Sequence, residues 1–135
     1  MIDFNKTFTP VAKFTSIWLI LAIIAEEQLY IHQMDVKTAF LYGILKETIY
    51  IDQSEGYIKK NQEYFICKLN KSLYGLKQAP RAWYSRIDIY LCQLGFKRII
   101  ADHGIYIKVD DDIKIILTLY MDNLLIFYNK LDIIY

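Results

Sequence analysis

The chain has 135 residues, of which 55 % are hydrophobic and 23 % charged, and its formal net charge is +1. This length and composition predict a single globular domain and exclude an intrinsically disordered chain. The charge is distributed unevenly, because residues 64–100 carry seven Lys or Arg and one acid, Asp88, between two acidic stretches. Such a stretch predicts a surface for a polyanion beside an acidic site.

The first predicted element is a helix over 14–29, which is apolar on nearly all sides. Its longest apolar run, 17–25, has nine residues, whereas a membrane span needs about 20. The run therefore predicts a core helix and no membrane partner. The opening of the chain is polar and carries both charges, so it does not predict a secretory signal.

Short strands are predicted next, at 31–36, 48–52 and 64–69. The two cysteines, Cys67 and Cys92, have apolar neighbours and no CxxC spacing. This pattern predicts buried, reduced thiols and an intracellular protein, without distinguishing the cytoplasm from the nucleus.

The clearest helix begins near Pro80, because proline suits the first helical turn, and ends at Gly95, a typical C-terminal cap. Its apolar residues recur at helical spacing and place Trp83 on the face that packs in the core. Three strands follow, and the predicted ranges are 105–109, 113–121 and 124–128. The order of elements predicts an α+β fold, an antiparallel sheet with helices packed on one face.

Two aspartates interrupt or end apolar strands, Asp35 in the first strand region and Asp122 after the strand 113–121. Rigid carboxylates are the ligands that Mg²⁺ needs, and two ions about 3.5–4 Å apart can clamp a phosphoryl transfer. The spacing alone equally fits two turn-forming aspartates at strand ends. A rival acidic cluster at 110–112 lies between two strands and indicates a hairpin turn instead.

The segment 67–86 interleaves basic and aromatic side chains. Its members are Lys68, Lys71, Lys77, Arg81 and Arg86 with Tyr74, Trp83 and Tyr84. Bases neutralise phosphates and aromatic faces stack on nucleobases, so the mixture suits a nucleic-acid template or a nucleotide. The alternative is a solvated helix face whose aromatic residues pack in the core.

Several longer motifs resemble the reverse transcriptases of copia-type LTR retrotransposons. They are TFTPVAKFTSIWLILAIIAE (7–26), QMDVKTAFLYG (33–43), KLNKSLYGLKQAPRAWY (68–84), ADHGIYIK (101–108) and LYMDN (119–123). The resemblance covers nearly the whole chain. It implies an RNA-directed DNA polymerase with a single domain over 1–135, a polymerase palm with partial fingers. It also implies two Mg²⁺ ions, an RNA or DNA primer–template and deoxynucleoside triphosphates.

The resemblance also implies roles for individual positions. Asp35 and Asp122 match catalytic metal ligands, and Phe40 matches the aromatic that excludes a ribose 2′-OH. The residues that match nucleotide-binding positions are Lys37, Thr38, Phe40, Tyr74, Gly75 and Lys77. The residues that match template or primer positions are Lys71, Arg81, Tyr120 and Met121.

Asn123 stands where the family has a third catalytic aspartate, and an amide lacks the charge of a carboxylate. Nothing in the chain matches the upstream fingers strands, the thumb or the RNase H domain of that family. Two functions therefore stay open. One is an active reverse transcriptase, and the other, which the missing carboxylate favours, is an inactive relic with at most weak nucleic-acid binding. The sequence leaves the oligomeric state open.

Overall fold

The computed structural model describes residues 9–131, so the ends of the predicted domain, 1–8 and 132–135, lie outside the described residues. Within the described range the chain forms two α-helices, a short 3-10 helix and seven strands. In chain order they are α1 (Phe14–Glu27), β1 (Tyr30–Asp35), η2 (Ala39–Tyr42), β2 (Tyr50–Asp52), β3 (Ile66–Lys68), α2 (Ala79–Gln93), β4 (Lys97–Arg98), β5 (Ile105–Asp110), β6 (Ile113–Tyr120) and β7 (Asn123–Tyr128).

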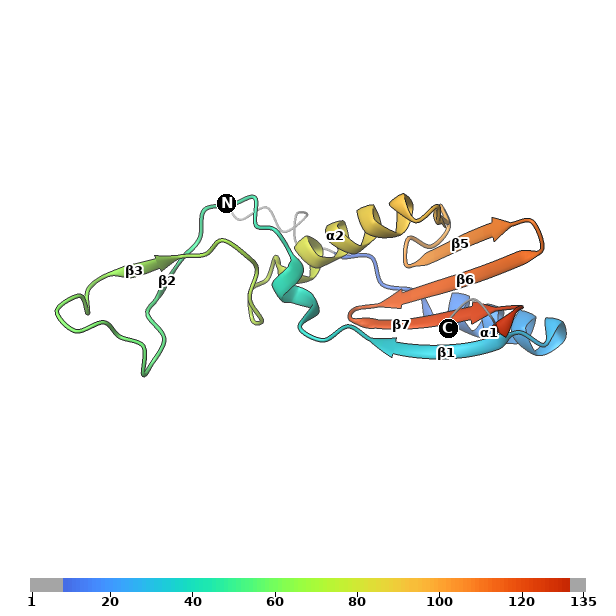
Figure 1. Cartoon of the computed structure of the whole chain (residues 1–135), viewed down its shortest axis with the longest axis horizontal. Helices are drawn as coiled ribbons and strands as arrows, with labels where there is room; N and C mark the ends of the chain where they lie inside the picture. The colour runs from blue at the N-terminus through green and yellow to red at the C-terminus, as the bar shows by residue number, and fades with distance from the viewer. Residues whose placement is uncertain (1–8, 132–135) are drawn as a thin grey trace.

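Five of the strands form one antiparallel sheet in the order β1-β7-β6-β5-β4. Strands β5, β6 and β7 follow one another as a meander, and β1 joins this meander from the early part of the chain. Strands β2 and β3 form a separate two-stranded ribbon that extends away from the sheet as an arm (Figure 1). The prediction of an α+β fold with an antiparallel sheet is confirmed.

The two helices cover opposite faces of the sheet, so the prediction of helices on one face is wrong. Helix α1 packs on a cluster that contains Ile105, Ile116 and Phe127. Helix α2 packs on a cluster that contains Tyr106 and Leu117. Neighbouring residues of a strand point to opposite faces of the sheet, and these strands carry apolar residues on both faces. Each face therefore needs its own cover, and α1 passes behind the sheet in Figure 1.

Both cysteine side chains are exposed, so the prediction of buried thiols is wrong. Cys67 lies in β3 on the arm, where apolar neighbours such as Ile66 and Tyr64 are themselves 58 % and 78 % exposed. Cys92 lies near the end of α2, outside its packed face. Apolar neighbours indicate burial only where the element packs on a core, and the arm extends away from it.

The segment before α1 is held against the sheet by Asp102 and Gly104. The carboxylate of Asp102 accepts hydrogen bonds from the backbone N–H groups of Lys13 (2.8 Å) and Gly104 (3.0 Å). The N–H of Ala12 donates to the carbonyl of Leu119 (3.2 Å), whose own N–H donates to the carbonyl of Gly104 (2.7 Å). These bonds fix the start of α1 beside the end of β6.

The pKa of Asp102 makes this attachment sensitive to acid. Burial alone would raise that pKa. Hydrogen bonds from the Ser16 hydroxyl and from the N–H groups of Lys13 and Gly104 outweigh burial, and the pKa is lowered from its usual 3.8. A lowered pKa means that the ionised carboxylate stabilises the fold above pH 3.8, and that this stabilisation is lost as the pH falls through the folded pKa.

We therefore expect Asp102→Asn to lower the free energy of unfolding at pH 7 by about 1–3 kcal/mol, because a charged acceptor is lost. The difference from the unaltered chain should shrink as the pH falls below about 4, in denaturation curves recorded from pH 7 downward. Asp112→Asn is the control, since Asp112 is 90 % exposed in a pair with Lys130 at 3.8 Å. A difference for Asp102→Asn that does not depend on pH would contradict this prediction.

Candidate active site

The hairpin between β6 and β7 turns through two residues, Met121 and Asp122. Tyr120 pairs with Asn123 and Leu119 with Leu124, so Asn123 is the first residue of β7. The predicted strand ranges 113–121 and 124–128 imply a turn at Asp122–Asn123, which is wrong by one position, because the pairing of the two buried leucines sets the register. Met121 has a φ of 59°, as two-residue hairpins require of their first turn residue.

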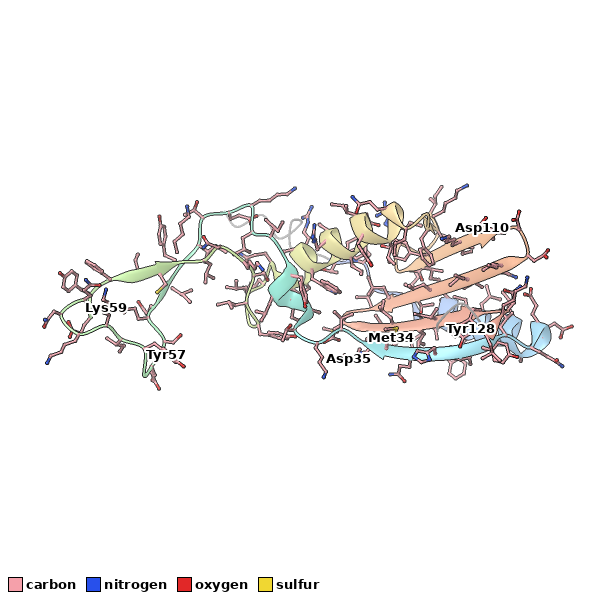
Figure 2. The ribbon with its side chains drawn as sticks, viewed as in Figure 1. Met34, Asp35, Tyr57, Lys59, Asp110 and Tyr128 are labelled. Carbon is pink, nitrogen blue, oxygen red and sulfur yellow. The ribbon has the colours of Figure 1, made fainter. Side chains whose placement is uncertain are left out.

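Strand β1 brings Asp35 to this turn. Asp35 pairs with Asn123 across the strands, and the N–H of Val36 donates to the carbonyl of Asp122 (2.9 Å). Figure 2 shows Asp35 where β1 leads into η2, at the opposite end of the sheet from Asp110. The structure thus places Asp35, Asp122 and Asn123 together at one end of the sheet. It confirms a hairpin turn at the 110–112 cluster, with Asp110 at the end of β5 and Asp111 and Asp112 in the turn.

The side chains at this end of the sheet offer two carboxylates and one amide. Asp35 is exposed and Asp122 is half-buried. The amide nitrogen of Asn123 donates to Oδ1 of Asp122 (3.2 Å). Across residues 9–131 no three His, Cys, Asp or Glu side chains gather closely enough to hold a metal ion.

This donor set fits one magnesium ion. Magnesium takes one or two protein carboxylates and completes its shell with water and substrate phosphates, and Asp35 and Asp122 supply that number. A second ion would have to share the same two carboxylates. The neutral Asn123 already occupies one oxygen of Asp122.

The residues after Asp35 lead directly into η2. Lys37 and Thr38 are exposed, and Thr38 has a φ of 55°, so the chain turns sharply before the helix. The hydroxyl of Thr38 donates to the carbonyl of Lys37 (2.7 Å). The N–H of Ala39 donates to the carbonyl of Val36 (3.1 Å), which closes the turn next to the aspartates.

Phe40 and Tyr74 come from distant segments and contact each other. Their ring centroids lie 4.9 Å apart with an interplanar angle of 62°, an edge-to-face arrangement that aromatic pairs prefer. Tyr74 and Gly75 are the central residues of a turn closed by the N–H of Leu76 on the carbonyl of Leu73 (3.3 Å). Gly75 has a φ of 89°, which glycine adopts without strain.

The segment that leads to Tyr74 is anchored beside η2. The N–H of Ser72 donates to the carbonyl of Gly43 (2.9 Å). The backbones of Lys71 and Ile44 form an isolated antiparallel β-bridge. The structure therefore brings the predicted nucleotide residues Phe40, Tyr74 and Gly75 to one region. Lys71 and Lys77 are exposed near the same turn.

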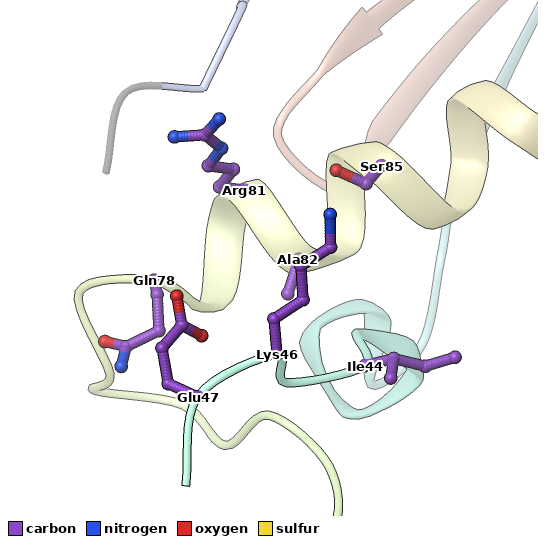
Figure 3. A pocket seen from close by; sticks show the side chains of 7 residues that line it. All are labelled: Ile44, Lys46, Glu47, Gln78, Arg81, Ala82 and Ser85. Carbon is purple, nitrogen blue, oxygen red and sulfur yellow. The ribbon is translucent and has the colours of Figure 1, made fainter. Parts of the chain in front are cut away.

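Arg81 lies on the first turn of α2, at a cavity of about 380 Å³. Figure 3 shows Lys46 and Glu47 on the segment that faces α2 across this cavity, with Gln78 before the helix. Neither aspartate lines it. The structure thus does not bring Arg81 into one cavity with the two aspartates.

Tyr120 and Met121, the predicted primer residues, are 38 % and 46 % exposed beside the turn. The Tyr120 ring lies 5.9 Å from the ring of Phe14, at the start of α1. The hydrogen bond that attaches the segment before α1 to the end of β6 therefore also keeps Phe14 beside Tyr120.

One residue near the turn has a role that the sequence did not indicate. Trp83 is buried, as predicted, but its indole N–H also donates to the carbonyl of Met121 (2.9 Å). A buried tryptophan usually finds an acceptor for its N–H, so the sequence did signal that a partner exists. It could not say which carbonyl would be the partner.

A polar network fixes α2 on the sheet further from the turn. Asp88 accepts hydrogen bonds from the Tyr106 hydroxyl (2.9 Å) and from Arg98 (3.1 Å). The Tyr84 hydroxyl donates to the carbonyl of His103 (2.9 Å). Burial is the main reason that the pKa of Tyr106 is raised. This network orients α2 and, with it, Trp83.

Neither α-helix in the described part of the chain has the length and apolar content needed to cross a bilayer.

Comparison with known proteins identifies the family of this chain. The reverse transcriptase (RNA-dependent DNA polymerase) family profile matches residues 1–135. The chain is 47 % identical over 126 residues to the retrovirus-related Pol polyprotein from transposon TNT 1-94 of Nicotiana tabacum, covering 93 % of this chain and 10 % of that protein. It is 39 % identical over 125 residues to the Pol polyprotein from transposon RE1 of Arabidopsis thaliana, covering 93 % of this chain and 8 % of that protein.

A further relative is the retrovirus-related Pol polyprotein from transposon RE2 of Arabidopsis thaliana, 38 % identical over 125 residues, with 93 % of this chain and 9 % of that protein covered. The chain therefore spans about a tenth of the length of these relatives. No solved structure matches it. The family profile covers the whole chain, and the chain belongs to the reverse transcriptase (RNA-dependent DNA polymerase) family, in the region shared with copia-type transposon Pol polyproteins.

Proposed function

We propose that the end of the sheet with Asp35, Asp122 and Asn123 is a site of template-directed nucleotidyl transfer, and that Asn123 strongly reduces its activity. In this proposal the five-stranded sheet and its helices are the palm of a DNA polymerase. The observation that carries it is the pairing of Asp35 with Asn123. Together with the bond from the Val36 N–H to the Asp122 carbonyl, this pairing brings Asp35 at the end of β1 beside Asp122 in the hairpin turn.

Asp35 and Asp122 would hold magnesium. When bound, the metal would neutralise phosphate charge and favour ionisation of the attacking 3′-hydroxyl. The protein's own part is positioning, since phosphoryl transfer needs little covalent chemistry from side chains. Asn123 contributes no charge, and its amide hydrogen bond to Asp122 competes with a metal for that carboxylate. One ion is therefore held less tightly than by three carboxylates, and a second less tightly still.

The surrounding residues suit the substrates of such a reaction. The Phe40–Tyr74 pair would give an aromatic wall for the sugar of a deoxynucleoside triphosphate, and the exposed Lys37, Thr38, Gly75 and Lys77 would contact its phosphates. Tyr120 and Met121 are exposed beside the turn, where a primer end would lie. Lys71 and Arg81 carry exposed positive charge for an RNA or DNA template strand.

A second function deserves a test because of one observation, the hydrogen bond between Asn123 and Asp122. If this bond keeps metal out, the chain is a non-catalytic relic that retains the fold and weak, salt-dependent binding to nucleic acid through its basic residues. Binding without synthesis distinguishes this function from the first.

Primer extension by the unaltered chain on poly(A)–oligo(dT), with Mg²⁺ or Mn²⁺, tests the proposal. We expect weak synthesis that requires the divalent metal and is abolished by Asp35→Asn. Synthesis that survives Asp35→Asn would refute the assigned site. Primer–template binding in an anisotropy assay without any synthesis, in either metal, would establish the relic function instead.

A further inference from the structure

Trp83 connects α2 to the hairpin turn through a part-buried hydrogen bond. Its side chain is 4 % exposed, and its indole N–H donates to the carbonyl of Met121 at 2.9 Å. Met121 immediately precedes Asp122. The indole therefore acts on the backbone next to the carboxylate, not on the carboxylate itself.

The hairpin turn has a strained backbone conformation that neighbouring groups must stabilise. Met121 has a φ of 59°, which costs a side-chain-bearing residue free energy and persists only where neighbouring groups over-determine it. Both carbonyls of the turn accept hydrogen bonds from outside the hairpin. Trp83 holds that of Met121, and the N–H of Val36 holds that of Asp122 (2.9 Å).

The position of Trp83 is itself fixed by close packing. A Cβ placed on Gly43 would lie 2.8 Å from Cβ of Ala82 and 3.0 Å from the backbone nitrogen of Trp83. The end of η2 therefore sits directly on α2 at this point, and the rings of Tyr42 and Trp83 lie 6.3 Å apart. Helix α2, η2 and the hairpin turn meet at Trp83.

We propose that Trp83 is a positioning residue. Its N–H holds Met121 in the conformation that sets Asp122 next to Asp35 and keeps the Val36 bond in register. The value of this placement for catalysis rests on the proposed function, in which Asp122 holds a metal. The placement itself can be measured without metal.

The sharpest test replaces Trp83 by 3-benzothienyl-alanine in the full chain, because sulfur then stands where the N–H was and the ring keeps its shape. Trp83→Phe is the genetically encoded companion. Ile20→Val is the control, since Ile20 packs in the other cluster under α1 and the variant removes one methylene there. Amide hydrogen exchange at Val36 and Mn²⁺ affinity from the EPR signal of free Mn²⁺ are measured in each protein.

In the unaltered chain the indole N–H of Trp83 should exchange slowly and that of Trp18, 70 % exposed, rapidly. With 3-benzothienyl-alanine, exchange at Val36 should accelerate about tenfold relative to Thr118, a buried residue of β6 that belongs to neither apolar cluster; tenfold is the factor expected for one lost hydrogen bond. The Mn²⁺ dissociation constant should rise by about tenfold, the lower end for groups that support metal ligands. Ile20→Val should change neither the exchange rate at Val36 relative to Thr118 nor the Mn²⁺ dissociation constant.

Unchanged exchange at Val36 would overturn the proposal. Faster exchange with unchanged Mn²⁺ affinity would also overturn it, because Trp83 would then stabilise the fold without placing the ligand. If the unaltered chain binds no Mn²⁺ while exchange at Val36 still responds to the replacement, the positioning role stands and the metal site of the proposed function fails.

Discussion

Replacing Asn123 by aspartate is expected to raise metal-dependent primer extension by at least about 10–100-fold, the range seen even when only groups supporting a metal ligand are changed. The variant restores an anionic oxygen pair and removes the amide that donates to Asp122. The measurement is the rate of nucleotide addition on poly(A)–oligo(dT) at several Mg²⁺ concentrations. The apparent Mg²⁺ requirement should fall together with the rise in rate.

Asn123→Ala separates the two causes of this gain. It frees the Asp122 carboxylate but adds no charge, so a gain shared by both variants would assign the defect to the hydrogen bond. A gain seen only in Asn123→Asp would assign it to the missing charge. If neither variant extends a primer faster than the unaltered chain, Asn123 is not what limits activity.

Asn123→Asp should also change the stability of the fold in a metal-dependent way. Asp35 is the direct cross-strand neighbour of position 123, and like charges placed opposite each other on a sheet are destabilising, by up to about 1 kcal/mol. Without divalent metal, Asn123→Asp should therefore melt at a lower temperature than the unaltered chain. Millimolar Mg²⁺ should reverse the loss, because a bound ion stabilises the folded state.

Gly104→Ala is expected to lower the free energy of unfolding by at least about 3 kcal/mol, the upper end of the usual range for overpacking. A Cβ at this position would meet the backbone nitrogen of Ala12 and lie 2.7 Å from its Cα. Backbone atoms cannot rotate away as a flexible side chain can. Urea denaturation followed by circular dichroism measures the loss.

Gly56→Ala is the matched control for Gly104→Ala. Gly56 has a φ of 81° but no atom within 4 Å of a built Cβ, so its cost is conformational alone, about 1–2 kcal/mol. If Gly104→Ala costs no more than Gly56→Ala, the close approach of 10–13 to the sheet does not contribute to stability as described.

Local patterns in the sequence predicted the regular elements well. The Pro80 start and apolar spacing correctly indicated α2, and the strand ranges of the β5–β7 meander are confirmed to within one or two residues. These signals depend on neighbouring residues, which the sequence displays directly. The family motifs correctly indicated reverse transcriptase.

Features that depend on long-range packing were missed or wrong. The sequence did not reveal that α1 and α2 take opposite faces, because each helix has an apolar face and the strands carry apolar residues on both sides of the sheet. It placed the Asp122 turn one residue late, since register is decided by which leucines meet. It also gave no partner for Trp83 or Asp102, whose bonds join residues 38 and 89 positions apart in the chain. The roles assigned to individual site residues remain predictions.

The strand order has a consequence for how the protein folds. The β5–β7 meander is built from consecutive hairpins and can form early through local contacts, whereas β1 pairs with β7 across most of the chain. Closing such a long loop is entropically costly, and pairings of this kind slow folding. We therefore expect Asp122 and Asn123 to be in place before Asp35 arrives. On this order the two aspartates become neighbours late in sheet assembly, so formation of the candidate site would report completion of the native topology.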